Sequence, residues 1–164
     1  MIGEATGVIA PIFENIPEVL TKRRQWVTWR LEERDGRLTK IPFTPESGRR
    51  ASVSDLMTWT TFEHAIEAYE RPEPHYHGLG YCFCSGDRFV GLDLDGCRNP
   101  DSGAIESWAQ KILLRVHEAH IEISPRGLGL HVIMEGTVPG GGMRRGPIEL
   151  YSQSRFFCMT GALL

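Results

Sequence analysis

Two aspartates, Asp93 and Asp95, are the residues best suited to chemistry in this sequence. They stand in the stretch VGLDLDG, which reads as a buried strand. Because side chains alternate along a strand, both carboxylates lie on one face, while Leu92 and Leu94 point into the core. Neighbouring carboxylates raise each other's pKa unless a cation such as Mg²⁺ or Mn²⁺ neutralises them. The alternative is an exposed polar face on an edge strand, and the pattern alone leaves both open.

A second segment, SPRGLGLHVI, combines glycines with polar donors. Gly127 and Gly129 let the backbone approach a ligand closely. Ser124, Arg126 and His131 offer donors suited to a triphosphate. The alternative is a glycine-bearing hairpin with an incidental histidine.

A third segment, PIELY, contributes one more carboxylate, Glu149. Alternation puts Glu149 on the face opposite Ile148 and Leu150, so it either completes a metal site or lies on the surface. The order of the three segments is the stronger signal. Two-metal phosphoryl transfer needs about three carboxylates to hold the metals and fixed cationic donors to hold the phosphates.

The elements around these segments predict an α+β fold. A hairpin over 25–43 turns at Asp35-Gly36. The strongest helix covers 103–116, where an apolar stripe follows helical spacing and Asp101 or Ser102 provides the cap. A glycine loop at 140–142 is expected to be mobile. The other predicted elements are helices over 16–24 and about 62–69, the second opened by a capping box at 60–63, and strands over 80–84, 88–95, 119–124, 128–135, 147–152 and 155–160.

Composition narrows the class of protein. The chain has 164 residues, 41% of them hydrophobic and 24% charged, which is ordinary for a globular protein. No apolar run approaches the roughly 18 residues of a membrane span, and we expect a cytoplasmic location. A net charge of −3 argues against avid non-specific DNA binding by the whole surface. The four cysteines lack the spacing of a zinc site and predict reduced thiols. Basic residues cluster at Lys22-Arg23-Arg24, Arg49-Arg50 and Arg144-Arg145.

The three segments resemble motifs I, II and III of the archaeo-eukaryotic primase superfamily: a hydrophobic-DhD strand, a small-residue-x-His strand and a hydrophobic-acidic strand. Four flanking stretches are similar to the phage and plasmid primase-polymerase branch. The resemblance therefore extends over about 25–161. The flanking stretches read WVTWRLEERDGRLTKIPFTP, ASVSDLMTWTTFEHA, GLGYCFC and SRFFCMTG.

This resemblance implies one primase-polymerase catalytic domain over 1–164. Its N-terminal α/β lobe would cover about 1–78. An RRM-like antiparallel sheet, the catalytic core, would cover about 79–164. The implied activity is DNA-templated nucleotide transfer in phage or plasmid replication, with NTPs or dNTPs as substrates and a single-stranded DNA template and primer as partners. We also expect the chain to be one module of a longer protein that carries, or works with, a helicase.

The resemblance also implies roles for individual residues. Asp93, Asp95 and Glu149 would hold Mg²⁺ or Mn²⁺ and, with His131, form the catalytic set. His131 would contact the phosphates of the incoming nucleotide, and Arg30 would contact nucleic acid. The further nucleotide-binding residues would be Ser124, Arg126, Gly129, Lys40 and Arg155.

Two other functions remain open on sequence grounds. A rolling-circle or relaxase-type endonuclease needs a His-hydrophobic-His metal motif and a catalytic tyrosine, and His75-Tyr76-His77 has the spacing but lies in a proline-rich loop. A non-catalytic single-strand binding module would stack bases on Phe156 and Phe157. Carboxylates on the same sheet would repel phosphates in such a module. The sequence does not distinguish NTP from dNTP use, or priming from extension.

Overall fold

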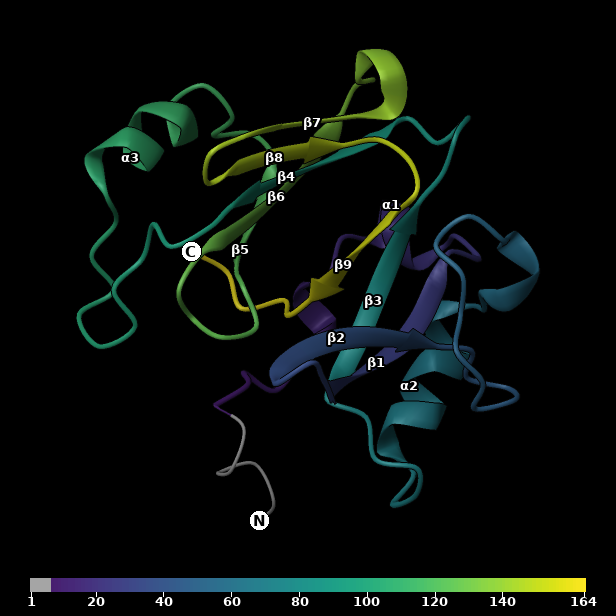
Figure 1. Ribbon diagram of the computed structural model, residues 1–164. Coiled ribbons are helices and arrows are strands. Elements are labelled where there is room, and N and C mark those ends of the chain that lie inside the picture. Colours follow the sequence, from purple (N-terminus) through teal and green to yellow (C-terminus); the bar gives the residue numbers. More distant parts are fainter. Residues whose placement is uncertain (1–6) are drawn as a thin grey trace.

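The computed structural model describes residues 7–164 and has an α+β architecture with two antiparallel sheets (Figure 1). The first sheet has the order β2-β1-β3-β9, and the second has the order β5-β6-β4-β8-β7. The strands of the first sheet are β1 (Trp26–Arg34), β2 (Arg37–Phe43), β3 (Gly78–Phe83) and β9 (Arg155–Met159). Those of the second are β4 (Phe89–Leu94), β5 (His120–Ile123), β6 (Leu130–Glu135), β7 (Gly142–Arg145) and β8 (Ile148–Tyr151).

The predicted hairpin over 25–43 is confirmed as β1 and β2. Its turn residues Asp35 and Gly36 have φ values of 50° and 73°, the positive pair that a tight two-residue hairpin turn requires. The first sheet then adds β3 beside β1 and β9 beside β3. It therefore draws two strands, β3 and β9, from residues 78–164, which were largely assigned to the predicted catalytic lobe. The division into two lobes at about residue 78 stays a prediction. Residues 1–6 of the predicted N-terminal lobe lie outside the described part of the chain.

Three helices accompany the sheets: α1 (Glu18–Thr21), α2 (Phe62–Glu70) and α3 (Ser107–Leu113). The predicted start of α2 at about residue 62 is confirmed, but the predicted capping box at 60–63 is displaced by one residue: the Thr61 hydroxyl accepts a hydrogen bond from the His64 N–H, while the Thr60 hydroxyl bonds Glu46. The predictions for α1 and α3 were too long. The predicted cap of α3 was also wrong, because the N–H groups of Asp101 and Ser102 bind Asn99 in a preceding turn.

The glycine loop at 140–142 contains a short 3-10 turn, Pro139–Gly141, in which Gly140 has a positive φ of 72°, and Gly142 begins the edge strand β7. The expected mobility of this loop stays a prediction. Sequence reasoning missed β7 because all four of its residues are exposed, so it has no apolar alternation to detect.

The two faces of the second sheet have different roles. One face carries Leu92 and Leu94 of β4 with Leu130 and Val132 of β6, and α3 covers it through Ala109. The predicted inward orientation of both β4 leucines is thus confirmed.

The opposite face of the second sheet lies against the first sheet. A methyl group added at Gly91 would come within 2.6 Å of the rings of Phe157 and Phe83. A shared core of residues from both sheets, including Trp26, Tyr81 and Ile133, fills this interface. Asp93, two residues beyond Gly91, therefore points into the region between the sheets.

Two further sequence expectations concern the thiols and the membrane. All four cysteines are free, and three of them are buried, as expected of reduced thiols. No helix in residues 7–164 is long and apolar enough to cross a bilayer.

Candidate active site between the two sheets

The registers of the second sheet align five polar side chains in one line across its strands. His131 of β6 stands opposite Glu122 of β5 on one side and Asp93 of β4 on the other. Glu149 of β8 stands opposite Asp93 and also opposite Arg144 of β7. Residues directly opposite each other in antiparallel strands project to the same face. We call this line the cross-strand row.

Asp93 occupies the centre of the row. Its side chain is 23% exposed, and its Oδ1 accepts no hydrogen bond from the described residues. Burial raises the pKa of Asp93, as do the charges of Asp95 and Glu149, while His131 and Lys40 act in the opposite direction. A bound cation would stabilise the ionised form of a carboxylate in this environment.

His131 bridges two carboxylates. Its Nδ1 lies 3.7 Å from Oε1 of Glu122, and its Nε2 lies 3.8 Å from Oδ1 of Asp93. The imidazole packs on the ring of Phe157 with centroids 4.8 Å apart. The ring therefore directs Nδ1 toward Glu122 and Nε2 toward Asp93, with neither separation short enough for a hydrogen bond.

Glu122 is a functional candidate that sequence reasoning missed. Its side chain is fully buried and accepts hydrogen bonds of 2.8 Å from the N–H groups of Thr160 and Gly161. His120 Nε2 lies 3.0 Å from its second oxygen. The pattern HIEI was the available signal, because alternation separates Glu122 from two isoleucines. Only the register with β6 reveals that it faces His131.

These contacts set the protonation of Glu122. Burial alone would raise its pKa, but the interactions with His120, His131 and the Thr160 N–H outweigh burial and lower the pKa to about 2. A carboxylate with a lowered folded-state pKa stabilises the fold above its unfolded pKa. That contribution is lost as the pH falls toward the folded-state value.

Acid unfolding should therefore report on Glu122. Between pH 4.5 and pH 2, wild type should lose stability on the order of 3 kcal/mol more than Glu122→Gln, which has no carboxyl to protonate. Urea unfolding across this pH range measures the difference. Parallel curves for the two proteins would contradict the buried, ionised carboxylate.

Glu149 is held by two residues that sequence reasoning did not assign. The Tyr151 hydroxyl donates a 2.7 Å hydrogen bond to its Oε2, and Arg144 Nε lies 3.1 Å from its Oε1. The Arg155 guanidinium lies over the Tyr151 ring, 4.6 Å from its centroid. Both oxygens of Glu149 thus already have partners from within the chain.

A cavity of about 160 Å³ opens beside the row. It brings together five of the residues predicted from sequence, two acidic and three basic or imidazole-bearing. These are Asp93, Glu149, His131, Lys40 and Arg155. Tyr151 of β8 and residues 156–158 of β9 complete its lining, so both sheets contribute to the cavity. A negative centre surrounded by cationic donors suits a ligand that carries phosphate and a metal cation.

Asp95 and the segment around Ser124 lie at one end of this site. The Asp95 N–H donates to the Pro147 carbonyl, which continues the β4–β8 pairing by one position. The Ser124 hydroxyl accepts from the Gly129 N–H at 3.0 Å. A methyl group at Gly129 would approach the Leu94 carbonyl oxygen to 2.5 Å, so glycine permits the close packing of this turn on β4.

Five predicted site residues do not line the cavity: the three just described, Asp95, Ser124 and Gly129, and two arginines. Arg126 is exposed on the turn between β5 and β6. Arg30 forms an ion pair of 2.9 Å with Glu32, and its guanidinium lies over the Phe43 ring. Their roles in binding nucleotide and nucleic acid stay predictions.

The structure gives little support to the two alternative sites. The His77 ring accepts a hydrogen bond from the Leu31 N–H and stacks on Trp29, while Tyr76 is buried. Phe157 is buried against His131, so it offers no free face to a base.

In the described part of the chain, no three His, Cys, Asp or Glu side chains already form a metal cluster. The donor chemistry still fits a hard cation, because Asp93 presents an unsatisfied oxygen next to Asp95 and Glu149.

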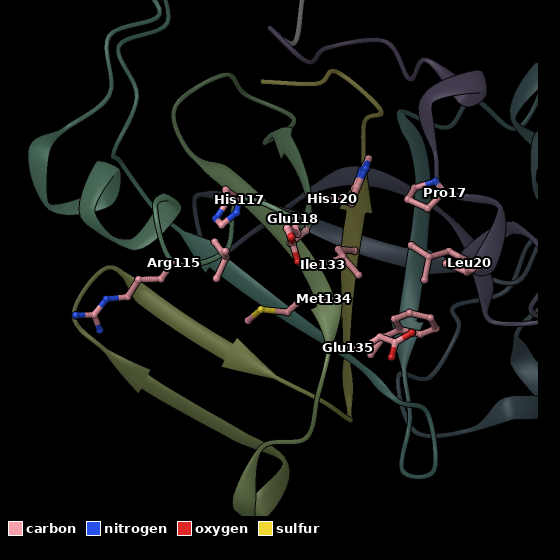
Figure 2. Close-up of a pocket in the computed structure, with 13 residues that line it drawn as sticks. Pro17, Leu20, Arg115, His117, Glu118, His120, Ile133, Met134 and Glu135 are labelled. Atoms are coloured by element: carbon pink, nitrogen blue, oxygen red, sulfur yellow. The ribbon is translucent and has the colours of Figure 1, made fainter.

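A larger cavity, of about 520 Å³, lies away from this site (Figure 2). Residues 115–120, the end of β6 and α1 line it, among them Leu20, Met134 and Glu135. It contains none of the acidic or basic residues predicted to act in catalysis. His120 alone links it to the row, through Glu122.

Comparison with known proteins gives one clear relationship. No family model matches the chain. Over 150 residues, 88% of its length, the chain is 32% identical to the "DNA Primase-polymerase" of Nitratiruptor phage NrS-1. It spans 20% of the length of that phage protein. The similarity covers nearly the whole chain, which is therefore homologous to one segment of that phage protein.

Proposed function

We propose that this chain is the catalytic module of a DNA-templated nucleotidyltransferase that acts in phage or plasmid replication inside the host cell. The observation that carries the proposal is the cross-strand row, which puts Asp93, Glu149 and His131 beside one cavity with Lys40 and Arg155. The phage relative is named a DNA primase-polymerase, which agrees with this chemistry. We further propose that the second sheet is the RRM-like core, with α3 covering the face opposite the row.

Asp93, Asp95 and Glu149 would hold Mg²⁺ or Mn²⁺. The unpartnered oxygen of Asp93 and its raised pKa support this assignment. Bound there, the cations would lower the pKa of a primer 3′-hydroxyl and offset charge on the leaving pyrophosphate. Glu149 would have to exchange its contact with Tyr151 or Arg144 for the cation.

The basic side chains of the cavity would position the nucleotide. His131, Lys40 and Arg155 would contact the phosphates of an NTP or dNTP, since cationic donors surround the acidic centre. Ser124, Arg126 and Gly129 would act from the β5–β6 turn, and Arg30 from the first sheet would meet nucleic acid. In this proposal the residues of the chain mainly position the substrates and neutralise the charge on the phosphates, as is general for phosphoryl transfer.

A primer-extension assay tests the proposal. We expect the chain to extend a labelled primer on a DNA template when Mg²⁺ or Mn²⁺ is present, and to lose all extension when the metal is chelated. Parallel reactions with NTPs and dNTPs establish the preferred sugar. Extension that persists in excess chelator would refute the metal-dependent mechanism.

If the folded protein shows no extension, a nucleotide titration decides the next step. Metal-dependent nucleotide binding would leave a catalytic module that needs further segments of a longer protein. No metal-dependent binding of either nucleotide class would reject the enzyme assignment.

A further inference from the structure

A second cavity, of about 420 Å³, lies beside the candidate active site. It shares two side chains with the smaller cavity, Tyr151 and Arg155, so the two are neighbours. We call it the arginine groove. Its lining consists of residues 140–143, Arg144, Tyr151, Gln153, Ser154 and Arg155.

The charged side chains that line the arginine groove are all positive. It contains two arginines and no acidic side chain, although the chain as a whole has a net charge of −3. The Arg144 side chain is 69% exposed and uses Nε to hold Glu149. A guanidinium has five N–H donors in a planar fork, so most donors of Arg144 remain for a ligand. The groove therefore favours an anion with oxygen acceptors.

The floor of the groove is backbone rather than side chains. Gly141 has a φ of 80°, and a methyl group there would collide with Gln153. A methyl group at Gly142 would come within 2.6 Å of the Tyr151 ring. Because both positions are glycine, no side chain fills the groove there, and an extended ligand can approach the backbone between the two arginines.

The spacing of the strands indicates what kind of anion fits. Arg144 is three strands away from His131 along the cross-strand row, about 14 Å at the usual distance between strands. This backbone separation favours contacts of the two side chains with different phosphate groups. A ligand that reaches both the active-site cavity and the groove must carry several phosphates in series.

We propose that the arginine groove binds the sugar-phosphate backbone of the nucleic-acid strand whose end enters the active site. This inference rests on the proposed function and names a binding site for its strand substrate. Arg144 pairs with phosphates of the strand, and Arg155, which lines both cavities, lies where the strand meets the nucleotide held by His131 and Lys40. Asp93 does not line the groove, and Glu149, the nearest carboxylate, is paired with Arg144 and Tyr151.

Fluorescence anisotropy with a labelled single-stranded DNA tests the groove without any turnover. We expect Arg144→Gln and Arg155→Gln each to weaken strand binding several-fold and to reduce the salt dependence of log K by about 0.7 per lost phosphate contact. Arg37→Gln is the matched control, because it removes the same charge from an exposed strand position outside the groove. Circular dichroism and thermal unfolding establish that each variant is folded.

A second variant leaves the Arg144–Glu149 pair intact. Met143 lines the groove and is 54% exposed, so Met143→Glu adds a negative charge at small structural cost. It should weaken strand binding as the arginine variants do. Strand affinities equal to that of Arg37→Gln in all three groove variants would overturn the proposal.

A nucleotide titration on the same variants separates the strand from a triphosphate. For Met143→Glu and Arg144→Gln, which change residues outside the lining of the active-site cavity, unchanged nucleotide affinity together with weakened strand binding supports the strand site. Weakened nucleotide affinity with unchanged strand binding assigns the groove to the triphosphate and overturns it. Neither result depends on catalysis, so failure of the groove is distinguishable from failure of metal-dependent extension.

Discussion

Asp93→Asn should abolish nucleotide addition, reducing extension by about 10³-fold or more, while the protein remains folded. Asparagine keeps the shape of the side chain but removes the charge that would bind the metal cation, and a loss of that size corresponds to about 4 kcal/mol of transition-state stabilisation. The same change should leave the melting temperature equal to that of wild type or raise it. Burial and the charges of Asp95 and Glu149 already disfavour an ionised Asp93 in the metal-free protein.

Two measurements on one preparation check this prediction. Single-turnover extension gives the catalytic loss, and thermal unfolding without divalent metal gives the stability. Asp101→Asn is the control, because Asp101 is exposed and distant from the row. Extension at the wild-type rate by a folded Asp93→Asn protein would remove Asp93 from the catalytic set.

Glu122→Ala should destabilise the protein by about 3–5 kcal/mol, the usual cost of breaking a buried charged network by removing one partner. The truncation leaves the N–H groups of Thr160 and Gly161 and the ring of His120 without their acceptor. Each unsatisfied buried donor costs about 1–3 kcal/mol. The free energy of unfolding in urea at neutral pH measures the effect.

The neighbouring Glu118→Ala provides the comparison for Glu122→Ala. Glu118 is exposed, and its truncation should change stability by no more than about 0.5 kcal/mol. Glu122→Gln should fall between the two, because one amide oxygen can replace only one carboxylate oxygen as an acceptor. Equal stability of the two alanine variants would show that the Glu122 network contributes little.

Local sequence patterns were sufficient where a feature depends on a few adjacent residues. Alternation in VGLDLDG correctly put Leu92 and Leu94 in the core, and Asp35-Gly36 correctly located a hairpin turn. Periodicity did not locate the start of α3, because residues 104–106 pair with 97–99 instead of forming a first helical turn: the Asn99 N–H donates to the Ala104 carbonyl and the Glu106 N–H donates to the Cys97 carbonyl. The apolar stripe itself was correct, since it packs on the second sheet.

The site required information that no local pattern contains. Glu122, Arg144 and Tyr151 join it only through the pairing of β5, β7 and β8 with their neighbours. Pairing between strands far apart in sequence depends on the global fold, so a lone Glu in HIEI reads as an ordinary strand residue. Lys40 was expected from resemblance alone, and the packing of the first sheet on the second brings it to the cavity.

The last residues of the chain give the second sheet a protected border. Residues 162–164 run beside β5, where the Ile123 N–H donates to the Ala162 carbonyl and the Leu164 N–H donates to the Ile121 carbonyl. At the other border, β7 presents exposed arginines. Unpaired strand edges invite association with other chains, and covering segments or edge charges prevent it. Both edges of the second sheet are therefore protected against pairing with other chains: residues 162–164 cover the β5 edge, and exposed arginines occupy the β7 edge.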